Sequence, residues 1–129
     1  MIQEAERAGK TVCYPYCASD TEIIALHPLS DGAIALGRYG IRTPEPALSE
    51  EIAPEDIGLV LVPCAAFDAK GRRVGMGAGY YDRFLPKCKK AVRALVANDC
   101  QRVDAITPKD TDAKMDLIVT EKGMEKIGK

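Results

Sequence analysis

IGLVLVP, residues 57–63, is a short and continuous apolar run that ends at a proline. A run that is apolar at every position is typical of a strand buried on both faces, as in a parallel sheet covered by helices. Two further runs of this kind follow, AVRALVA at residues 91–97, broken only by Arg93, and LIVT at residues 117–120. Strands of this type, separated by helical or loop segments, predict an α/β layered domain.

The segments around these runs predict further elements. Residues 2–8 have a helical composition, and Gly9 is a suitable stop. Residues 11–17 and 22–27 predict two strands, and Pro15 in the first indicates either a sheet edge or an early strand end. Three prolines and two glycines predict a long irregular segment over residues 37–54, and a polar helix-like tail is expected after residue 120. Since a helix that leads into a buried strand normally follows another strand, we expect the sheet to lack its first strand.

The bulk composition fits one domain over residues 1–129. Hydrophobic residues make up 47% of the 129 residues and charged residues 29%, which is ordinary for a globular protein. The formal net charge of -1 gives no reason to expect nucleic-acid binding. No apolar run reaches the length of a membrane span, and the first ten residues contain no apolar core of a signal peptide.

The cysteines predict reduced thiols. Their number, five, is odd, and no two of them form a CxxC pair. This pattern indicates a cytoplasmic protein without disulfides. The single histidine, His27, has no partner at ligand spacing, which argues against a zinc site.

The stretch VPCAAFDAKGRRVGMGAGYYDRFL, residues 62–85, contains the residues suited to chemistry. It begins at the carboxyl end of a predicted strand, where ligands bind in open α/β sheets. A turn at residues 68–71 precedes Arg72 and Arg73, and the glycine-rich loop 75–79 then enters a helix. Glycines and a helix start allow close approach of a phosphate, and arginine matches its geometry. The spacing alone fits a structural glycine turn with core tyrosines equally well.

The stretch resembles the signature of the 5-formyltetrahydrofolate cyclo-ligase (5,10-methenyltetrahydrofolate synthetase) family. The shared features are a strand ending in V-P, then A-F-D, a turn glycine, an arginine and G-x-G-x-G-Y-Y-D-R. They are met here by Val62, Pro63, Ala66, Phe67, Asp68, Gly71, Arg73, Gly75, Gly77, Gly79, Tyr80, Tyr81, Asp82, Arg83, Phe84 and Leu85. Weaker similarity extends over nearly the whole chain. The resemblance implies a three-layer α/β/α fold with a mainly parallel sheet, like that of NagB, RpiA and CoA transferases, without its first helix and strand.

The resemblance also implies an activity in folate one-carbon metabolism. The family uses ATP and Mg²⁺ to close 5-formyltetrahydrofolate to 5,10-methenyltetrahydrofolate. The formyl oxygen attacks the γ-phosphate of ATP, N10 attacks the resulting imidate phosphate, and phosphate leaves. By similarity, the catalytic residues would be Arg73 and Tyr81. The residues that bind ATP would be Arg73, Gly75, Gly77, Ala78, Gly79, Tyr80 and Asp82. The residues that border the folate would be Phe67, Tyr80 and Tyr81. The ligand of Mg²⁺ would be Asp82.

The sequence departs from the family pattern at several positions. Met76 stands where many relatives have a basic or aromatic residue, and Ala78 where they have lysine or glycine. Cys64 replaces a usual glycine, and Asp110-Thr111-Asp112 lacks a frequent histidine. The chain begins at the equivalent of the family's second helix, after the basic residues and the glutamate that contact ATP and folate. Three hypotheses follow: an enzyme or enzyme fragment, a non-catalytic folate- or nucleotide-binding paralogue, and an unrelated ATP-using protein with a convergent loop. A homodimer formed through the edge that lacks its strand is a further expectation.

Overall fold

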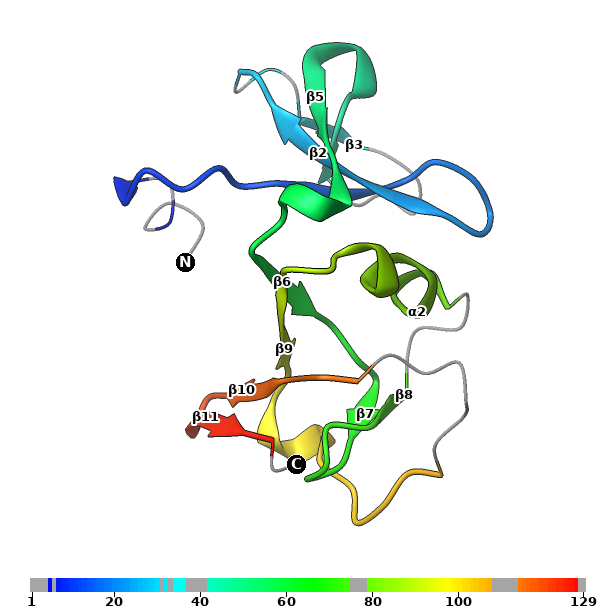
Figure 1. The fold of residues 1–129 in the computed structure, drawn as a ribbon, viewed down its shortest axis with the longest axis vertical. Coiled ribbons are helices and arrows are strands. Elements are labelled where there is room, and N and C mark those ends of the chain that lie inside the picture. Colours follow the sequence, from blue (N-terminus) through cyan, green and yellow to red (C-terminus); the bar gives the residue numbers. More distant parts are fainter. Residues whose placement is uncertain are drawn as a thin grey trace. The chain divides into compact units, whose positions relative to one another are not determined.

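The structure is a computed structural model that describes residues 5, 7–30, 32, 34–36, 42–74, 79–107 and 114–127, with only the backbone of 34–36, 42 and 43. It divides into two compact units, residues 1–53 and 54–129, which are described separately (Figure 1). The prediction of one domain therefore stays a prediction. Within the described part of the chain, no helix is long and apolar enough to cross a membrane.

The first unit contains an antiparallel sheet with the order β1-β2-β5. Its strands are β1 (Tyr14–Cys17), β2 (Ile23–Pro28) and β5 (Ser49–Ile52). Pro15 lies in the edge strand β1, the first of the two predicted alternatives, because proline cannot donate a hydrogen bond to a second neighbour. Ahead of this sheet Ala5 and Arg7 are helical, Gly9 has a φ of 80°, and the Lys10 amide donates to the Ala5 carbonyl at 3.0 Å. This bond closes the helix end at the predicted glycine.

The prediction of an irregular segment over residues 37–54 is wrong for much of its length. Strand β3 (Ile34–Leu36) pairs with β4 (Arg42–Pro44), and the 3-10 helices η3 (Pro46–Leu48) and η4 (Pro54–Asp56) flank β5. Strand β5 has the polar sequence SEEI, which lacks strand periodicity. Its backbone pairing with β2, in which Ala25 lies opposite Ile52, makes it a strand. Residues 37–41 lie outside the described part.

The second unit contains a mixed sheet with the order β11-β10-β9-β6. The strands β6 (Leu59–Val62), β9 (Val92–Val96) and β10 (Leu117–Thr120) are parallel, which confirms the three predicted apolar strands. The expected helical tail is wrong, because residues 123–126 form β11 (Gly123–Lys126), antiparallel to β10. Gly123 has a φ of 129° and lies opposite Thr120, so a glycine turn reverses the chain here. The fold is mixed α/β, and the described residues do not show three layers.

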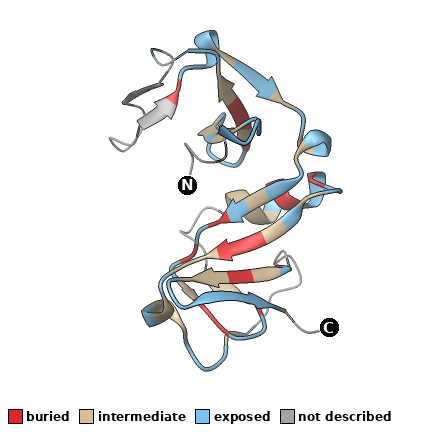
Figure 2. Ribbon diagram, turned by 90° about the vertical axis from the view of Figure 1, so that its left-hand side faces the viewer, coloured by how far each residue is buried: buried red, intermediate tan, exposed pale blue. Residues whose placement is uncertain are grey.

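One face of this sheet carries the core. The prediction of burial on both faces is wrong for β6, because Leu59 is 57% exposed and Leu61 39% exposed. Figure 2 shows buried residues in red within the parallel strands, whereas β11 is exposed along its whole length. The helix α2 (Tyr80–Phe84) and the 3-10 helix η5 (Leu85–Lys87) supply side chains to the core. The buried cluster comprises Val62, Cys64, Phe67, Leu85, Leu95, Met115 and Ile118.

The turn between β7 (Ala66–Phe67) and β8 (Arg73–Val74) is closed by a buried carboxylate. Asp68 is 2% exposed. Its Oδ1 accepts the backbone amides of Lys70 at 2.9 Å and Arg72 at 3.0 Å, and its Oδ2 accepts the Ile106 amide at 3.0 Å. Since a charged acceptor strengthens each of these bonds, the turn and the segment at residue 106 are fixed to each other.

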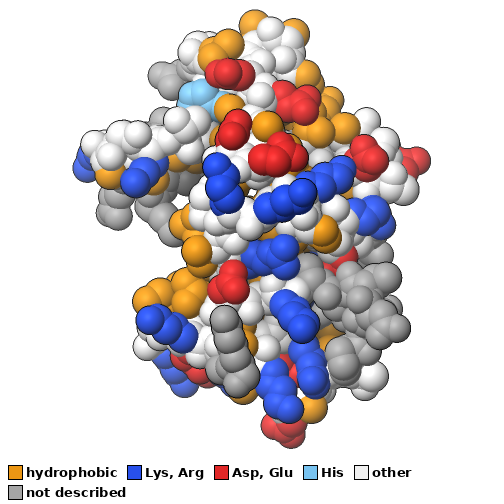
Figure 3. All heavy atoms as spheres, in the orientation of Figure 1, with side chains coloured by type: hydrophobic (Ala, Val, Ile, Leu, Met, Phe, Trp, Pro, Cys, Tyr) orange, Lys and Arg blue, Asp and Glu red, His pale blue; other side chains and the backbone are white. Residues whose placement is uncertain are grey.

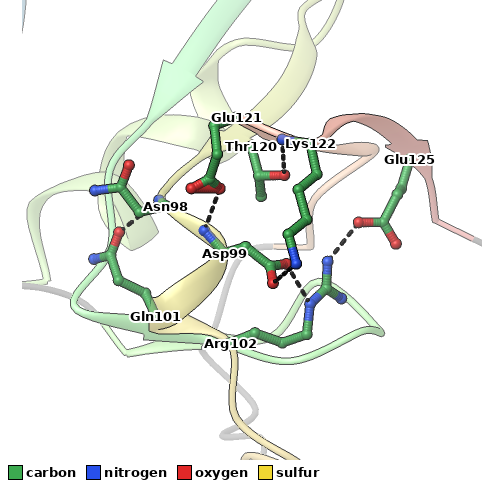
Figure 4. Close-up of polar contacts among 8 residues, drawn as sticks. All are labelled: Asn98, Asp99, Gln101, Arg102, Thr120, Glu121, Lys122 and Glu125. Atoms are coloured by element: carbon green, nitrogen blue, oxygen red, sulfur yellow. Dashed lines mark hydrogen bonds and ion pairs between the residues drawn. The ribbon is translucent and has the colours of Figure 1, made fainter.

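A charged cluster joins η6 (Asp99–Gln101) to the β10–β11 hairpin (Figure 4). The Asp99 carboxylate lies 3.1 Å from both Lys122 Nζ and Arg102 Nε, and Arg102 also pairs with Glu125. The Asp99 amide donates to Glu121 Oε1 at 2.6 Å. These contacts explain why a short polar strand such as β11 stays at the sheet edge. Elsewhere on the surface viewed in Figure 3, basic and acidic side chains lie side by side.

Gly71→Ala should destabilise the protein. Gly71 is buried with a φ of 81°, and an added Cβ would overlap Cδ1 of Ile127 and lie 3.4 Å from the Met115 Cβ. We expect a loss of about 1–3 kcal/mol in the free energy of unfolding, measured by urea denaturation. Gly58→Ala is the matched control, since nothing lies within 4 Å of its added Cβ, and it should change stability by less than about 0.5 kcal/mol. Equal losses in the two variants would contradict the prediction.

Asp99→Asn should reduce stability in a pH-dependent manner. Hydrogen bonds from Lys122 and then Arg102 lower the pKa of Asp99 from its ordinary value of 3.8. A carboxylate with a lowered pKa in the folded chain stabilises it fully above the unfolded pKa and loses this effect as the pH falls through the folded pKa. We expect the wild type to be the more stable protein at about pH 7 and the difference to shrink as the pH falls through the lowered pKa of Asp99. A difference that persists in acid would show that charge is not its cause.

Candidate functional site

The structure brings together two of the predicted site segments. Arg73 lies on β8, and Tyr80, Tyr81 and Asp82 lie in the first turn of α2 (Figure 1). Gly79 precedes the helix with a φ of 69°, a left-handed conformation that favours glycine. The predicted phosphate-binding residues Gly75, Gly77 and Ala78, together with Met76, lie outside the described residues.

The Arg73 side chain is the centre of this arrangement. It is 6% exposed, and its Nη2 lies 3.2 Å from Asp82 Oδ1. Its Nη1 makes a long bond of 3.5 Å to the Pro63 carbonyl, and its guanidinium lies 5.7 Å from the centroid of the Tyr81 ring. The pair joins residues nine positions apart, so that the strand β8 and the helix α2 are held against each other.

One donor of this buried cation is not satisfied. The Nε of Arg73 is buried and has no hydrogen-bond partner among the residues that the structure describes. Leaving a charged donor unpaired in the interior costs free energy unless an acceptor arrives. An anionic oxygen would satisfy it, and a phosphate fits the donor geometry of arginine. The site is therefore chemically suited to a phosphate group.

The two tyrosines have different surroundings. Tyr81 is partly buried and packs against the core cluster. Tyr80 is also half-buried, and the Arg83 guanidinium lies 5.8 Å from the centroid of its ring. Both rings are thus accessible in part while anchored on the same short helix. This placement suits the predicted contacts with a planar ligand.

Phe67 is placed differently from a residue that lines a pocket. Its side chain is fully buried, with 0% exposure, in the core cluster. The Arg102 guanidinium lies 5.0 Å from the centroid of its ring. In this structure Phe67 packs within the core, and its contact with folate stays a prediction.

Cys64 follows the end of β6 and lies close to Arg73. Its side chain is 3% exposed. Burial raises the pKa of its thiol above the ordinary value of 9.0, and the nearby charge of Arg73 only partly opposes this. The thiol therefore stays protonated at neutral pH and is no candidate nucleophile.

Asp82 is the carboxylate available for Mg²⁺. Its side chain is 27% exposed and already faces Arg73. Among the described residues no group of three metal-ligating side chains occurs, and Asp110 and Asp112 lie outside them. A single carboxylate fits Mg²⁺, which is often held by one or two carboxylates together with substrate phosphates. Asp116 instead accepts the Arg93 amide at 2.9 Å, in agreement with a capped loop before β10.

Sequence reasoning missed the residues that hold the site together. Gln101 donates to the Cys64 carbonyl at 3.0 Å and so fixes the loop after β6. Arg93 donates to the Leu85 carbonyl at the end of α2 at 2.9 Å. For Arg93 the sequence offered a signal, because a single charge interrupts an otherwise apolar strand.

Comparisons with known proteins agree with the resemblance in the sequence. The profile of the 5-formyltetrahydrofolate cyclo-ligase family matches residues 1–121. The 5-formyltetrahydrofolate cyclo-ligase of Escherichia coli (strain K12) is 29% identical, over 93% of this chain and 68% of that protein. That of Mycolicibacterium smegmatis is 32% identical, over 88% of this chain and 61% of that protein.

A solved structure is similar as well. The NMR structure of Aquifex aeolicus 5,10-methenyltetrahydrofolate synthetase has a TM-score of 0.81 and 31% sequence identity to this chain. The match covers 99% of this chain and 63% of that one. The chain thus spans about two thirds of the length of the relatives, with coverages of 61%, 63% and 68%.

Arg73→Met should abolish the rise in melting temperature that a bound anion gives to the protein. Inorganic tripolyphosphate at roughly ten times its dissociation constant should raise the melting temperature of the wild type by about 3 °C and that of the variant not at all. Without ligand the variant should also be less stable, because the substitution removes the ion pair of Arg73 with Asp82, so each shift is measured from the melting temperature of that same variant without ligand. Arg72→Met, which removes a neighbouring cation bonded to the Ile106 carbonyl at 3.3 Å, is the matched control and should keep the shift. The prediction fails if both variants retain it.

Proposed function

Because the chain belongs to the 5-formyltetrahydrofolate cyclo-ligase family, we propose that it converts 5-formyltetrahydrofolate to 5,10-methenyltetrahydrofolate with ATP and Mg²⁺. The observation that supports this proposal is the buried Arg73 Nε, which has no hydrogen-bond partner in the described part of the chain, beside the carboxylate of Asp82 and the ring of Tyr81. A cation and a metal-binding carboxylate suit phosphoryl transfer, and an aromatic ring suits contact with a planar ligand such as a folate.

Arg73 would neutralise the charge that develops on the transferred phosphoryl group. Its guanidinium is held on two sides, by Asp82 and by the Pro63 carbonyl, so little reorganisation is needed when an anion arrives. Bound ATP supplies the phosphoryl group, and bound Mg²⁺ offsets the negative charge of its oxygens. Asp82, in the first turn of α2, would offer a carboxylate oxygen to the metal.

The tyrosines would position the folate. Tyr81 combines a ring that packs on the core with a hydroxyl that can donate to the substrate. Tyr80 lies one residue earlier on the same short helix. Holding the formyl oxygen in line with the phosphoryl group contributes to catalysis by reducing the entropy lost in the reaction step. Gly79 would let the backbone before α2 approach the phosphates, since it has no Cβ.

The test of this proposal is the formation of 5,10-methenyltetrahydrofolate, followed by its near-ultraviolet absorbance. We expect turnover by the wild type with 5-formyltetrahydrofolate, ATP and Mg²⁺, and none without ATP. Tyr81→Ala should lower kcat/KM by about a hundredfold, whereas Tyr81→Phe, which keeps the ring, should lower it by about tenfold. The matched control is Tyr14→Ala, since Tyr14 lies on β1 of the first unit and is not among the residues proposed for this site.

The alternative is a protein that binds the ligands without turnover. No product, together with a rise in melting temperature with ATP or 5-formyltetrahydrofolate, would support the binding protein. If no product forms and neither ligand raises the melting temperature, both proposals are overturned. A partner copy is tested in the same preparation, because light scattering distinguishes a monomer from the proposed homodimer.

A further inference from the structure

Arg93 is a charged residue in the middle of an apolar strand. It lies on β9 between Val92 and Ala94, and its side chain points to the same sheet face as Leu95, which is fully buried. A cation at such a position needs several acceptors, because burial without them is costly. The acceptors that the Arg93 side chain contacts therefore indicate its role.

The guanidinium of Arg93 joins two segments that are far apart in the sequence. Its Nη2 donates to the Leu85 carbonyl at 2.9 Å, and its Nη1 donates to the Lys114 carbonyl at 3.2 Å. Its backbone is fixed as well, since its amide donates to Asp116 Oδ2 at 2.9 Å and its carbonyl accepts the Asp116 amide at 2.8 Å. The side chain is thus oriented by the sheet before it reaches the helix.

The Leu85 carbonyl lies at the C-terminal end of α2, the helix that carries part of the candidate site. Leu85 is the C-terminal cap of α2, and its own amide donates to the Tyr81 carbonyl. The same carbonyl accepts the Cys88 amide at 3.0 Å, so the Arg93 cation adds a second donor at this end, where it also interacts favourably with the helix dipole. Because α2 has only five residues, a displacement of its end is transmitted to Tyr80, Tyr81 and Asp82 in its first turn.

We propose that Arg93 is a positioning residue that holds α2, and with it Tyr81 and Asp82, against the sheet. The functional part of this inference rests on the proposed function, because it is the folate and ATP groups that α2 would position. The anchoring of α2 is independent of it. Arginine suits this role because its fork reaches two carbonyls at once, which a lysine ammonium at the same position cannot do with the same geometry.

Anchoring is tested by amide hydrogen exchange in Arg93→Leu. We expect the Leu85 and Cys88 amides, which bond to the Tyr81 and Leu85 carbonyls, to exchange at least about tenfold faster. The Ala97 amide, which bonds to the Val119 carbonyl within the sheet, should be unchanged. Equal acceleration at all three amides, or none, would overturn the proposal.

Positioning is tested by the kinetics of the same variant. A purely structural role would lower the amount of folded enzyme and hence the apparent kcat, but would leave KM unchanged. We expect instead that Arg93→Leu raises KM for 5-formyltetrahydrofolate by about fivefold to tenfold and that Arg93→Lys restores part of the loss. Val92→Ala, at an exposed position on the opposite face of β9, is the matched control and should keep the wild-type KM.

The two proposals fail in different ways. A wild-type chain without turnover overturns the proposed function, and the exchange of the Leu85 and Cys88 amides still decides whether Arg93 anchors α2. An active wild type with unchanged KM in Arg93→Leu leaves the proposed function intact and overturns positioning by Arg93.

Discussion

The buried carboxylate of Asp68 is the constraint on which the second unit depends. It accepts three backbone amides, two within its own turn and one from Ile106, at 2.9 to 3.0 Å. The turn places β8 antiparallel to β7, with Phe67 opposite Arg73. Phe67 lies in the core, and Arg73 opposite it reaches Asp82 on α2. A single carboxylate therefore fixes both a core residue and the cation of the candidate site.

The packing of the core and the geometry of the site share their residues. Leu85 belongs to the buried cluster and also caps the helix that carries Asp82. Tyr81 packs on the same cluster while its ring lies near Arg73. Arg73 differs from these residues, because its buried Nε has no hydrogen-bond partner among the residues that the structure describes. Such a donor is retained at the expense of stability, which is typical of residues that serve a ligand.

Local patterns predicted the parts of the fold that depend on local chemistry. The apolar runs at residues 59–62, 92–96 and 117–120 are strands, and the proline in β1 marks an edge. The pattern failed for β5 and β11, whose sequences SEEI and GMEK are polar, because pairing with β2 and β10 decides their structure. The site residues on β8 and α2 came from a family resemblance. The ion pair that joins them could not be predicted, since it depends on a turn closed by Ile106.

The charged residues of this unit differ in what they do because they differ in surroundings. Arg102 is exposed enough for its pairs with Asp99 and Glu125 to be weakened by water, and it serves to hold an edge strand. Arg93 donates to a partly buried backbone carbonyl, and the side chain of Arg73 is itself buried, so that each missing partner costs more there than at the surface. Both arginines have acceptors for their two terminal nitrogens, and Arg73 has in addition a buried Nε without a partner among the residues that the structure describes. This unpaired donor distinguishes Arg73, which we propose as a ligand-binding residue, from Arg93, which we propose as a positioning residue.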